Sequence, residues 1–210
     1  VGNYSVATNG TETKPWGLSF NDDGTKMFVS GDTTDKILEY HLSTPFTISS
    51  ASYDSGFDLS GQDATIVGHA FNNDGTKLFV IGNTNDAVFE YTLSTGFDVS
   101  TASKNSNECS FIGLGDDVVD INFNSDGTKI FLVDQGQDGA PNTIEEFDLS
   151  TAYDLSSCTH VEEHFAGDFE LVGIEFNPDG TKLFIYDMTG TDSIKPVSYT
   201  HLTLPTTFGV

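Results

Sequence analysis

Four carboxylates recur at nearly one spacing ahead of a repeated phenylalanine, and grouped carboxylates could hold a cation. Glu12, Asp63 and Asp168 each lie eight residues before that phenylalanine, and Asp116 lies seven before it. Such oxygen ligands suit Ca²⁺, with Asp63, Asp116 and Asp168 as the candidate set and Asp117 beside them as a further ligand-binding candidate. The alternative is turn chemistry, because aspartate in loops often bonds nearby backbone amides. The dense Asp-x-Asp-x-Asp spacing of the usual calcium loop is absent.

Two further ligand-binding candidates, His69 and Asp120, break an otherwise consistent repeat position. The other repeats carry Leu18, Ile121 and Ile174 at the position of His69, and Gly17, Gly68 and Gly173 at the position of Asp120. Such local breaks sometimes mark functional residues. The alternative for His69 is a core histidine whose ring nitrogens are hydrogen-bonded.

The segment CTHVEEH (158–164) carries zinc-type ligands at alternate positions, namely Cys158, His160, Glu162 and His164. On a strand these side chains share one face, but each step of two residues spans nearly 7 Å, so one ion could take at most two neighbours. A metal role is therefore disfavoured. A disulfide between Cys109 and Cys158 is also disfavoured, because the two lie near opposite ends of their expected strands.

A repeated phrase supplies the elements that must position these residues. The phrase occurs as FNDDGTKMFV (20–29), FNNDGTKLFV (71–80), FNSDGTKIFL (123–132) and FNPDGTKLFI (176–185). Each Asp-Gly pair predicts a tight hairpin, and the flanking alternation of apolar and polar residues predicts strands. The second repeat shows four such strands, at 65–72, 77–83, 87–94 and within 104–113. Two phenylalanine positions in each repeat are expected to pack in the core between neighbouring sheets.

These repeats resemble the bacterial and phage β-propeller repeats of the YVTN and WD40-like superfamily, and most of all the Asp-Gly-Thr-Lys-rich repeats of marine proteins. The resemblance covers residues 1 to about 195 and implies an all-β partial propeller. The implied propeller comprises about three complete four-stranded blades plus two part-blades, and is a fragment of a larger closed propeller. The repeats lie at approximately 9–60, 61–115, 116–168 and 169–195. Residues 1–8 are expected to be the last strand of a preceding blade.

The pattern stops after Tyr186 and Asp187, so the fourth repeat is expected to have two strands only. Residues 197–207 resemble a translated sequencing-library adapter of the transposon type. The segment 196–210 is therefore predicted to be a non-native tail on a metagenomic fragment. The alternative is a genuine terminal strand, since Thr and Leu alternate there.

Charge narrows the range of partners. Eight basic residues oppose 32 acidic residues, for a formal charge of −24. This charge disfavours nucleic acid and anionic membranes as partners, and no apolar run is long enough to insert into a membrane. The expected partners are a protein or a glycan and the remaining blades of the same chain. The acidity also suits an extracellular, cell-surface or virion location, where salt screens the charge.

The connections divide into repetitive and variable ones, and this division carries the functional hypothesis. The Asp-Gly hairpins and the Leu-Ser-Thr connections hardly change. The variable loops are 30–35, 81–86 and 134–142 after the second strands, and 60–63, 114–117 and 166–168 before the first strands. Variable loops on a constant scaffold are typical of binding surfaces, although drift under weak constraint is the alternative. The hypothesis is a binding module. The other possibilities are a lactonase-like hydrolase with a divalent cation and a structural spacer.

Overall fold

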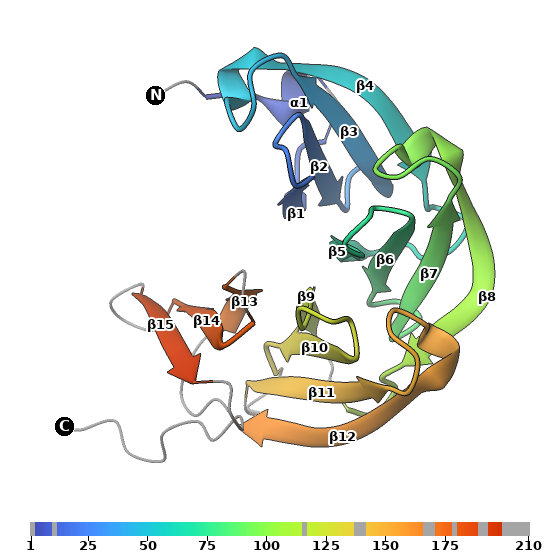
Figure 1. Ribbon diagram of the computed structural model, residues 1–210, viewed down its shortest axis with the longest axis vertical. Helices are drawn as coiled ribbons and strands as arrows, with labels where there is room; N and C mark the ends of the chain where they lie inside the picture. The colour runs from blue at the N-terminus through green and yellow to red at the C-terminus, as the bar shows by residue number, and fades with distance from the viewer. Residues whose placement is uncertain are drawn as a thin grey trace. The chain divides into compact units, whose positions relative to one another are not determined.

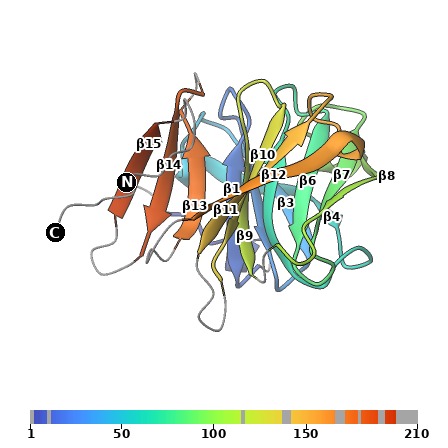
Figure 2. The same cartoon turned by 90° about the horizontal axis from the view of Figure 1, so that it is seen from below.

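The chain is an all-β β-propeller, seen here in a computed structural model that describes residues 3–9, 12–114, 117–136, 142–165, 171–177, 180–188 and 193–198. The described residues form three four-stranded sheets and one three-stranded sheet, all antiparallel and each with its strands in chain order (Figure 1). The strands of each sheet are twisted relative to one another (Figure 2). Residues 1–110 and 111–210 form two compact units. No helix within the described ranges is long and apolar enough to span a membrane.

The first unit contains two complete blades. Its first sheet consists of β1 (Pro15–Phe20), β2 (Lys26–Gly31), β3 (Lys36–Leu42) and β4 (Ala51–Asp58). Its second sheet consists of β5 (Ile66–Phe71), β6 (Lys77–Gly82), β7 (Ala87–Leu93) and β8 (Ala102–Ser110). The short 3₁₀ helices η1 (Ile48–Ser50) and η2 (Val99–Thr101) each precede the outermost strand of a sheet.

The second unit contains one complete blade and a three-stranded sheet. The complete sheet consists of β9 (Val118–Phe123), β10 (Lys129–Asp134), β11 (Thr143–Leu149) and β12 (Cys158–Phe165), with η3 (Leu155–Ser157) before its last strand. The other sheet consists of β13 (Leu171–Phe176), β14 (Lys182–Asp187) and β15 (Ser193–Ser198).

Two sequence expectations about the flanks are wrong. The described part of the expected strand, residues 3–8, is not a strand: Val6–Asn9 forms the short helix α1, and Tyr4 and Val6 pack against the apolar cluster of the first sheet. No strand in the described part of the chain pairs with this segment. The fourth repeat has three strands, because β15 pairs with β14 along its whole length. Pro196 fits there because, among the described residues, β15 has a neighbour on one side only.

The two repetitive connections are one structural unit. Gly75 of the Asp-Gly hairpin has φ of +69°, and Phe97 of the Leu-Ser-Thr connection has φ of +56°. The Phe97 amide donates to the Gly75 carbonyl at 3.0 Å. A Cβ atom on Gly75 would meet the Phe97 ring at 2.3 Å. The other complete blades repeat the contact with Gly24 and Phe46, and with Gly127 and Tyr153. These two connections therefore share one end of each blade, as expected from the sequence.

The repeated phenylalanines build the core within each unit. In the first unit the rings of Phe28 and Phe71, from neighbouring sheets, have centroids 4.6 Å apart. In the second unit Phe131 and Phe176 pack in the same way at 5.2 Å. These contacts confirm the expected packing between sheets for Phe28, Phe71, Phe131 and Phe176. This packing leaves the loops at the blade ends as the variable part of a rigid frame.

Candidate functional site

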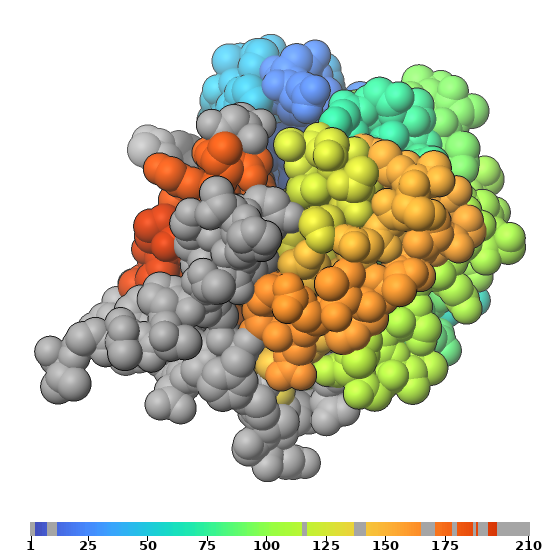
Figure 3. Space-filling model, turned by 60° about the horizontal axis from the view of Figure 1, so that its bottom comes forward, coloured from blue at the N-terminus to red at the C-terminus, as the bar shows by residue number. Residues whose placement is uncertain are grey.

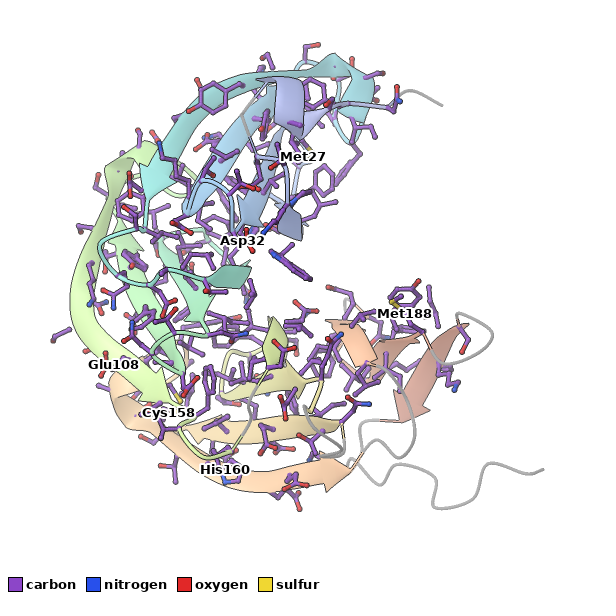
Figure 4. The ribbon with its side chains drawn as sticks, turned by 180° about the vertical axis from the view of Figure 1, so that it is seen from behind. Met27, Asp32, Glu108, Cys158, His160 and Met188 are labelled. Atoms are coloured by element: carbon purple, nitrogen blue, oxygen red, sulfur yellow. The ribbon has the colours of Figure 1, made fainter. Side chains whose placement is uncertain are left out.

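The variable loops of the first unit gather at the end of the blades opposite the Asp-Gly hairpins. We call residues 32–35, 59–65 and 83–86 the loop face. The Leu59 amide donates to the Asp35 carbonyl at 2.8 Å, and the Asn85 side-chain amide donates to the Gln62 carbonyl at 2.9 Å. Hydrogen bonds thus connect loops that are far apart in sequence, and Asp32 lies in the first of them (Figure 4).

Glu12, the first of the four spaced carboxylates, is fully buried beneath the loop face. Its Oε1 accepts hydrogen bonds from the backbone amides of Lys14 and Thr33, at 2.7 and 3.3 Å. Its Oε2 accepts from the backbone amide and the hydroxyl of Thr34, at 3.1 and 2.9 Å. Both oxygens therefore have two donors each, and the carboxylate fixes the loop between β2 and β3.

Asp63 makes the same arrangement one repeat later, and its side chain is also buried. Its Oδ1 accepts from the amides of Thr65 and Thr84 at 2.8 and 3.2 Å. Its Oδ2 accepts from the backbone and side-chain amides of Asn85, both at 3.0 Å. We call this set of four hydrogen bonds on a buried carboxylate the carboxylate clamp. A cation could reach Glu12 or Asp63 only by displacing these donors.

The clamp also explains why the second strand ends in glycine in the first two repeats and in aspartate in the third. A Cβ atom on Gly31 or Gly82 would lie 2.3 Å from the clamp carboxylate of its own repeat. The third repeat has Asp134 at this position, and there the carboxylate comes from the strand: the Asp117 amide donates to Asp134 Oδ1 at 2.9 Å. Asp117, one of the predicted ligand-binding residues, therefore uses its backbone amide to bond Asp134 in this loop. Asp116 and Asp168 lie outside the described residues.

The loop face concentrates negative charge around Asp35. Burial raises the pKa of Asp35, and the nearby carboxylates of Asp32, Asp58, Glu12 and Asp63 raise it further. The sequence analysis did not single out Asp35, although its position immediately before a third strand recurs as Asp86. Both residues have a positive φ, of 50° and 49°, which is the turn conformation that aspartate tolerates.

His69 joins the inner strands of the two blades in the first unit. Its Nε2 lies 2.8 Å from Ser19 Oγ, and its Nδ1 lies 2.9 Å from Ser30 Oγ. The ring is buried, and burial lowers the pKa of His69 to about 4. The ring is therefore neutral at physiological pH, with one nitrogen donating and the other accepting. This is the arrangement of a hydrogen-bonded core histidine.

Asp120 has a comparable place in the second unit. Its Oδ1 accepts from the Ile121 amide at 2.9 Å, and its Oδ2 accepts from the Ile174 amide of the next sheet at 2.8 Å. Burial raises the pKa of Asp120 to about 7, and the Glu175 carboxylate adds to the rise. Burial also raises the pKa of Glu175, which accepts a hydrogen bond from the Asn122 side chain at 3.0 Å. Sequence reasoning missed Glu175.

The cysteines of the outer strands differ from expectation. Cys109 and Cys158 are both disulfide-bonded, so the expectation against a disulfide is wrong. Their places near opposite ends of β8 and β12 say nothing about the distance between strands of different sheets. On β12, His160 (Figure 4) bonds Glu145 at 2.8 Å, whereas His164 bonds Glu146 at 2.9 Å, so the two histidines have different partners.

Comparison with known proteins identifies the fold and no family. No protein-family profile and no curated protein matches the chain. A candidate 6-phosphogluconolactonase from Bacteroides fragilis is 14% identical with a TM-score of 0.62, over 88% of this chain and 50% of that one. The hydrazine synthase of Kuenenia stuttgartiensis is 18% identical with a TM-score of 0.59, over 94% and 50%. The β-propeller domain of Cps50 (Swd1) from Myceliophteria thermophila is 8% identical with a TM-score of 0.54, over 83% and 50%. The chain thus spans about half the length of each.

Proposed function

We propose that this chain is a binding module that recognises a protein or glycan partner through the loop face. The observation that carries the proposal is the carboxylate clamp. Glu12 and Asp63 are buried and each accepts four hydrogen bonds, so they shape the loops instead of presenting ligand atoms. Loops that vary in sequence but are held rigid by a constant device suit recognition, because little conformational entropy is lost on binding.

The charge of the loop face favours a partner with basic or neutral groups. Burial raises the pKa of Asp35, and four nearby carboxylates raise it further, so negative charges lie close together on the loop face. The chain as a whole carries a formal charge of −24. Such a field attracts a basic protein surface and tolerates a neutral glycan, and it repels nucleic acid.

An extracellular, cell-surface or virion location belongs to the same proposal. Both cysteines are disulfide-bonded, and disulfides persist in oxidising surroundings. The high acidity is tolerated best where salt screens it. A module exposed in this way meets proteins and glycans on other surfaces.

The test is to select binders from a displayed peptide library and a glycan array, and then to map them with two matched variants. Ala64→Arg places a bulky side chain at an exposed position of the loop face. Ser94→Arg adds the same group at an exposed position of the opposite blade end. We expect Ala64→Arg to weaken binding by about tenfold or more, as a disrupted interface centre does, and Ser94→Arg to leave it unchanged. The reverse pattern, or the absence of any binder, would overturn the proposal.

A hydrolase is the second candidate, and two observations favour it. The fold is shared with a candidate 6-phosphogluconolactonase, and Asp120 and Glu175 are neighbouring carboxylates whose pKa values burial raises. The discriminating measurement is hydrolysis of a simple lactone with and without Ca²⁺. Calcium-dependent hydrolysis that Asp120→Asn abolishes would replace the binding module with an enzyme.

A further inference from the structure

The outer pair of strands in the third blade brings three metal-ligating side chains together. Donor atoms of Glu146, on β11, and of Glu162 and His164, on β12, all lie within 4.8 Å of one another. In the antiparallel register Glu146 is opposite Glu162, and Ile144 is opposite His164. The neighbouring strand therefore supplies the third ligand that β12 by itself could not.

The distances suit a tetrahedral ion. His164 Nε2 lies 2.9 Å from Glu146 Oε2 and 3.7 Å from Glu162 Oε1. Ligand atoms about 2.0–2.1 Å from a tetrahedral Zn²⁺ are about 3.3 Å apart, between the two observed separations. Small side-chain rotations would equalise them. An imidazole nitrogen with two carboxylate oxygens is a set that suits Zn²⁺ and disfavours Ca²⁺, which takes oxygen ligands only.

Two of the three candidate ligand side chains are buried and the third is exposed to solvent. The side chains of His164 and Glu146 are 7% and 8% exposed, whereas that of Glu162 is 60% exposed. Two ligands are thus anchored and one closes from the solvent side, which leaves a fourth position open to water. Figure 3 shows the strand that carries His164 and Glu162 on the surface of the second unit.

A hydrogen bond from Lys129 holds the Glu146 carboxylate in place. Its Oε1 accepts a hydrogen bond from Lys129 Nζ, which also bonds Asp148, so Oε2 is the oxygen directed at His164. Hydrogen bonds of this kind orient ligating carboxylates in metal sites. The Lys129 charge opposes a cation, and the Asp148 carboxylate beside it offsets that charge.

The other blades show that this set is not needed for the fold. The first sheet keeps the Lys26–Glu39 pair, but Ser55 is opposite Glu39 and Phe57 is opposite Ile37. There Glu39 Oε2 accepts from the Val99 amide of the next blade at 2.9 Å, which is a structural use of the same glutamate.

The second sheet has the same framework without the same ligands. It keeps the Lys77–Glu90 pair, and the Asn105 side chain donates to Glu90 Oε1 at 2.8 Å. Cys109 is the residue opposite Val88, where the third sheet has His164 opposite Ile144. The histidine and the second glutamate therefore have no counterpart in the two other complete blades.

We propose that Glu146, Glu162 and His164 form a three-ligand Zn²⁺ site on the outer face of the third blade. The ion ties the outermost strand β12 to β11, and its open position holds water or a ligand atom from a bound partner. This site shares no residue with the loop face, so its test does not depend on the proposed binding function.

Titration calorimetry with ZnCl₂ tests the site in the oxidised protein, where neither cysteine offers a thiolate. We expect one tight equivalent of Zn²⁺ and no comparable binding of Ca²⁺. Glu162→Gln and His164→Gln should each weaken Zn²⁺ binding by about tenfold or more, since loss of even supporting groups costs that much. Co²⁺ in the same site should show the visible absorption of a tetrahedral N/O complex.

Two matched controls separate this site from general attraction to an acidic protein. His160→Gln removes a histidine on the same strand that bonds Glu145. Glu90→Gln removes the equivalent glutamate of the second sheet. Both should leave the tight equivalent intact. Circular dichroism checks folding, and Glu162→Gln remains decisive if His164→Gln unfolds, because the Glu162 side chain is mostly exposed. Binding that survives Glu162→Gln, that His160→Gln weakens equally, or that Ca²⁺ matches would overturn the site.

Discussion

At the scale of single residues, some buried carboxylates of this chain serve mainly to accept backbone hydrogen bonds, whereas in others burial also raises the pKa. Glu12 and Asp63 accept backbone hydrogen bonds from loops about twenty residues further along the chain. Asp120 accepts two amide hydrogen bonds, yet burial raises its pKa to about 7. Desolvation therefore outweighs hydrogen bonding at Asp120.

Asp120 predicts a pH dependence of stability. Its pKa is raised from 3.8 to about 7 on folding, so between these values the folded state binds a proton that the unfolded state releases. The free energy of unfolding should therefore fall as pH rises through this window and level off above it, by at most about 1.4 kcal/mol per pH unit. Asp120 keeps some solvent exposure, so the slope should be smaller than this limit.

The measurement compares denaturant unfolding of the parent and of Asp120→Asn from pH 5 to pH 8. The variant cannot ionise at this position, so its curve should be flatter. The difference in slope isolates Asp120 from the other carboxylates, whose repulsion acts in both proteins. Equal slopes would show that Asp120 is already ionised at pH 5.

At the scale of elements, each hairpin depends on an aromatic side chain from another connection of its own blade. The Asp-Gly phrase by itself predicts the turn and its positive φ. It does not reveal that Phe97 covers Gly75, because the contact joins segments 22 positions apart. The pairs of lysine with glutamate, such as Lys77 with Glu90, were missed for the same reason.

Gly75→Ala should destabilise the first unit by about 2 kcal/mol, because alanine is strained at positive φ and its Cβ would enter the Phe97 ring. Gly61→Ala is the matched control, since a Cβ there meets nothing within 4 Å and its φ is not positive. Thermal and urea unfolding measure both. Similar losses in the two variants would contradict the role given to the contact of Gly75 with Phe97.

At the scale of the whole molecule, charge rather than any single contact sets the response to solution conditions. The formal charge of −24 arises because only 8 basic residues oppose 32 acidic ones. Ion pairs with acidic side chains are formed by Lys14, Lys26, Lys77 and Lys129. The acidic residues far outnumber the basic ones, so the excess negative charge repels itself in the compact state.

Raising NaCl from about 10 mM to about 0.3 M should therefore increase the melting temperature, because the screening length shortens to below about 10 Å. A few ion pairs weaken at the same time, but the repulsive pairs are more numerous. Differential scanning calorimetry at constant pH measures the effect, and an equal osmolality of sucrose controls for general exclusion. A melting temperature that falls with NaCl would mean that the ion pairs dominate.

The amino-acid sequence by itself determined the strands and hairpins of the three complete blades, because period-2 alternation and glycine turns are local. It also located the spaced carboxylates. Only the tertiary structure decided what they do: Glu12 is saturated by Thr33 and Thr34, and Glu146 meets His164 across two strands. Hydrogen-bond partners, burial and ligand distances are set by contacts between distant segments, and no local pattern encodes those contacts.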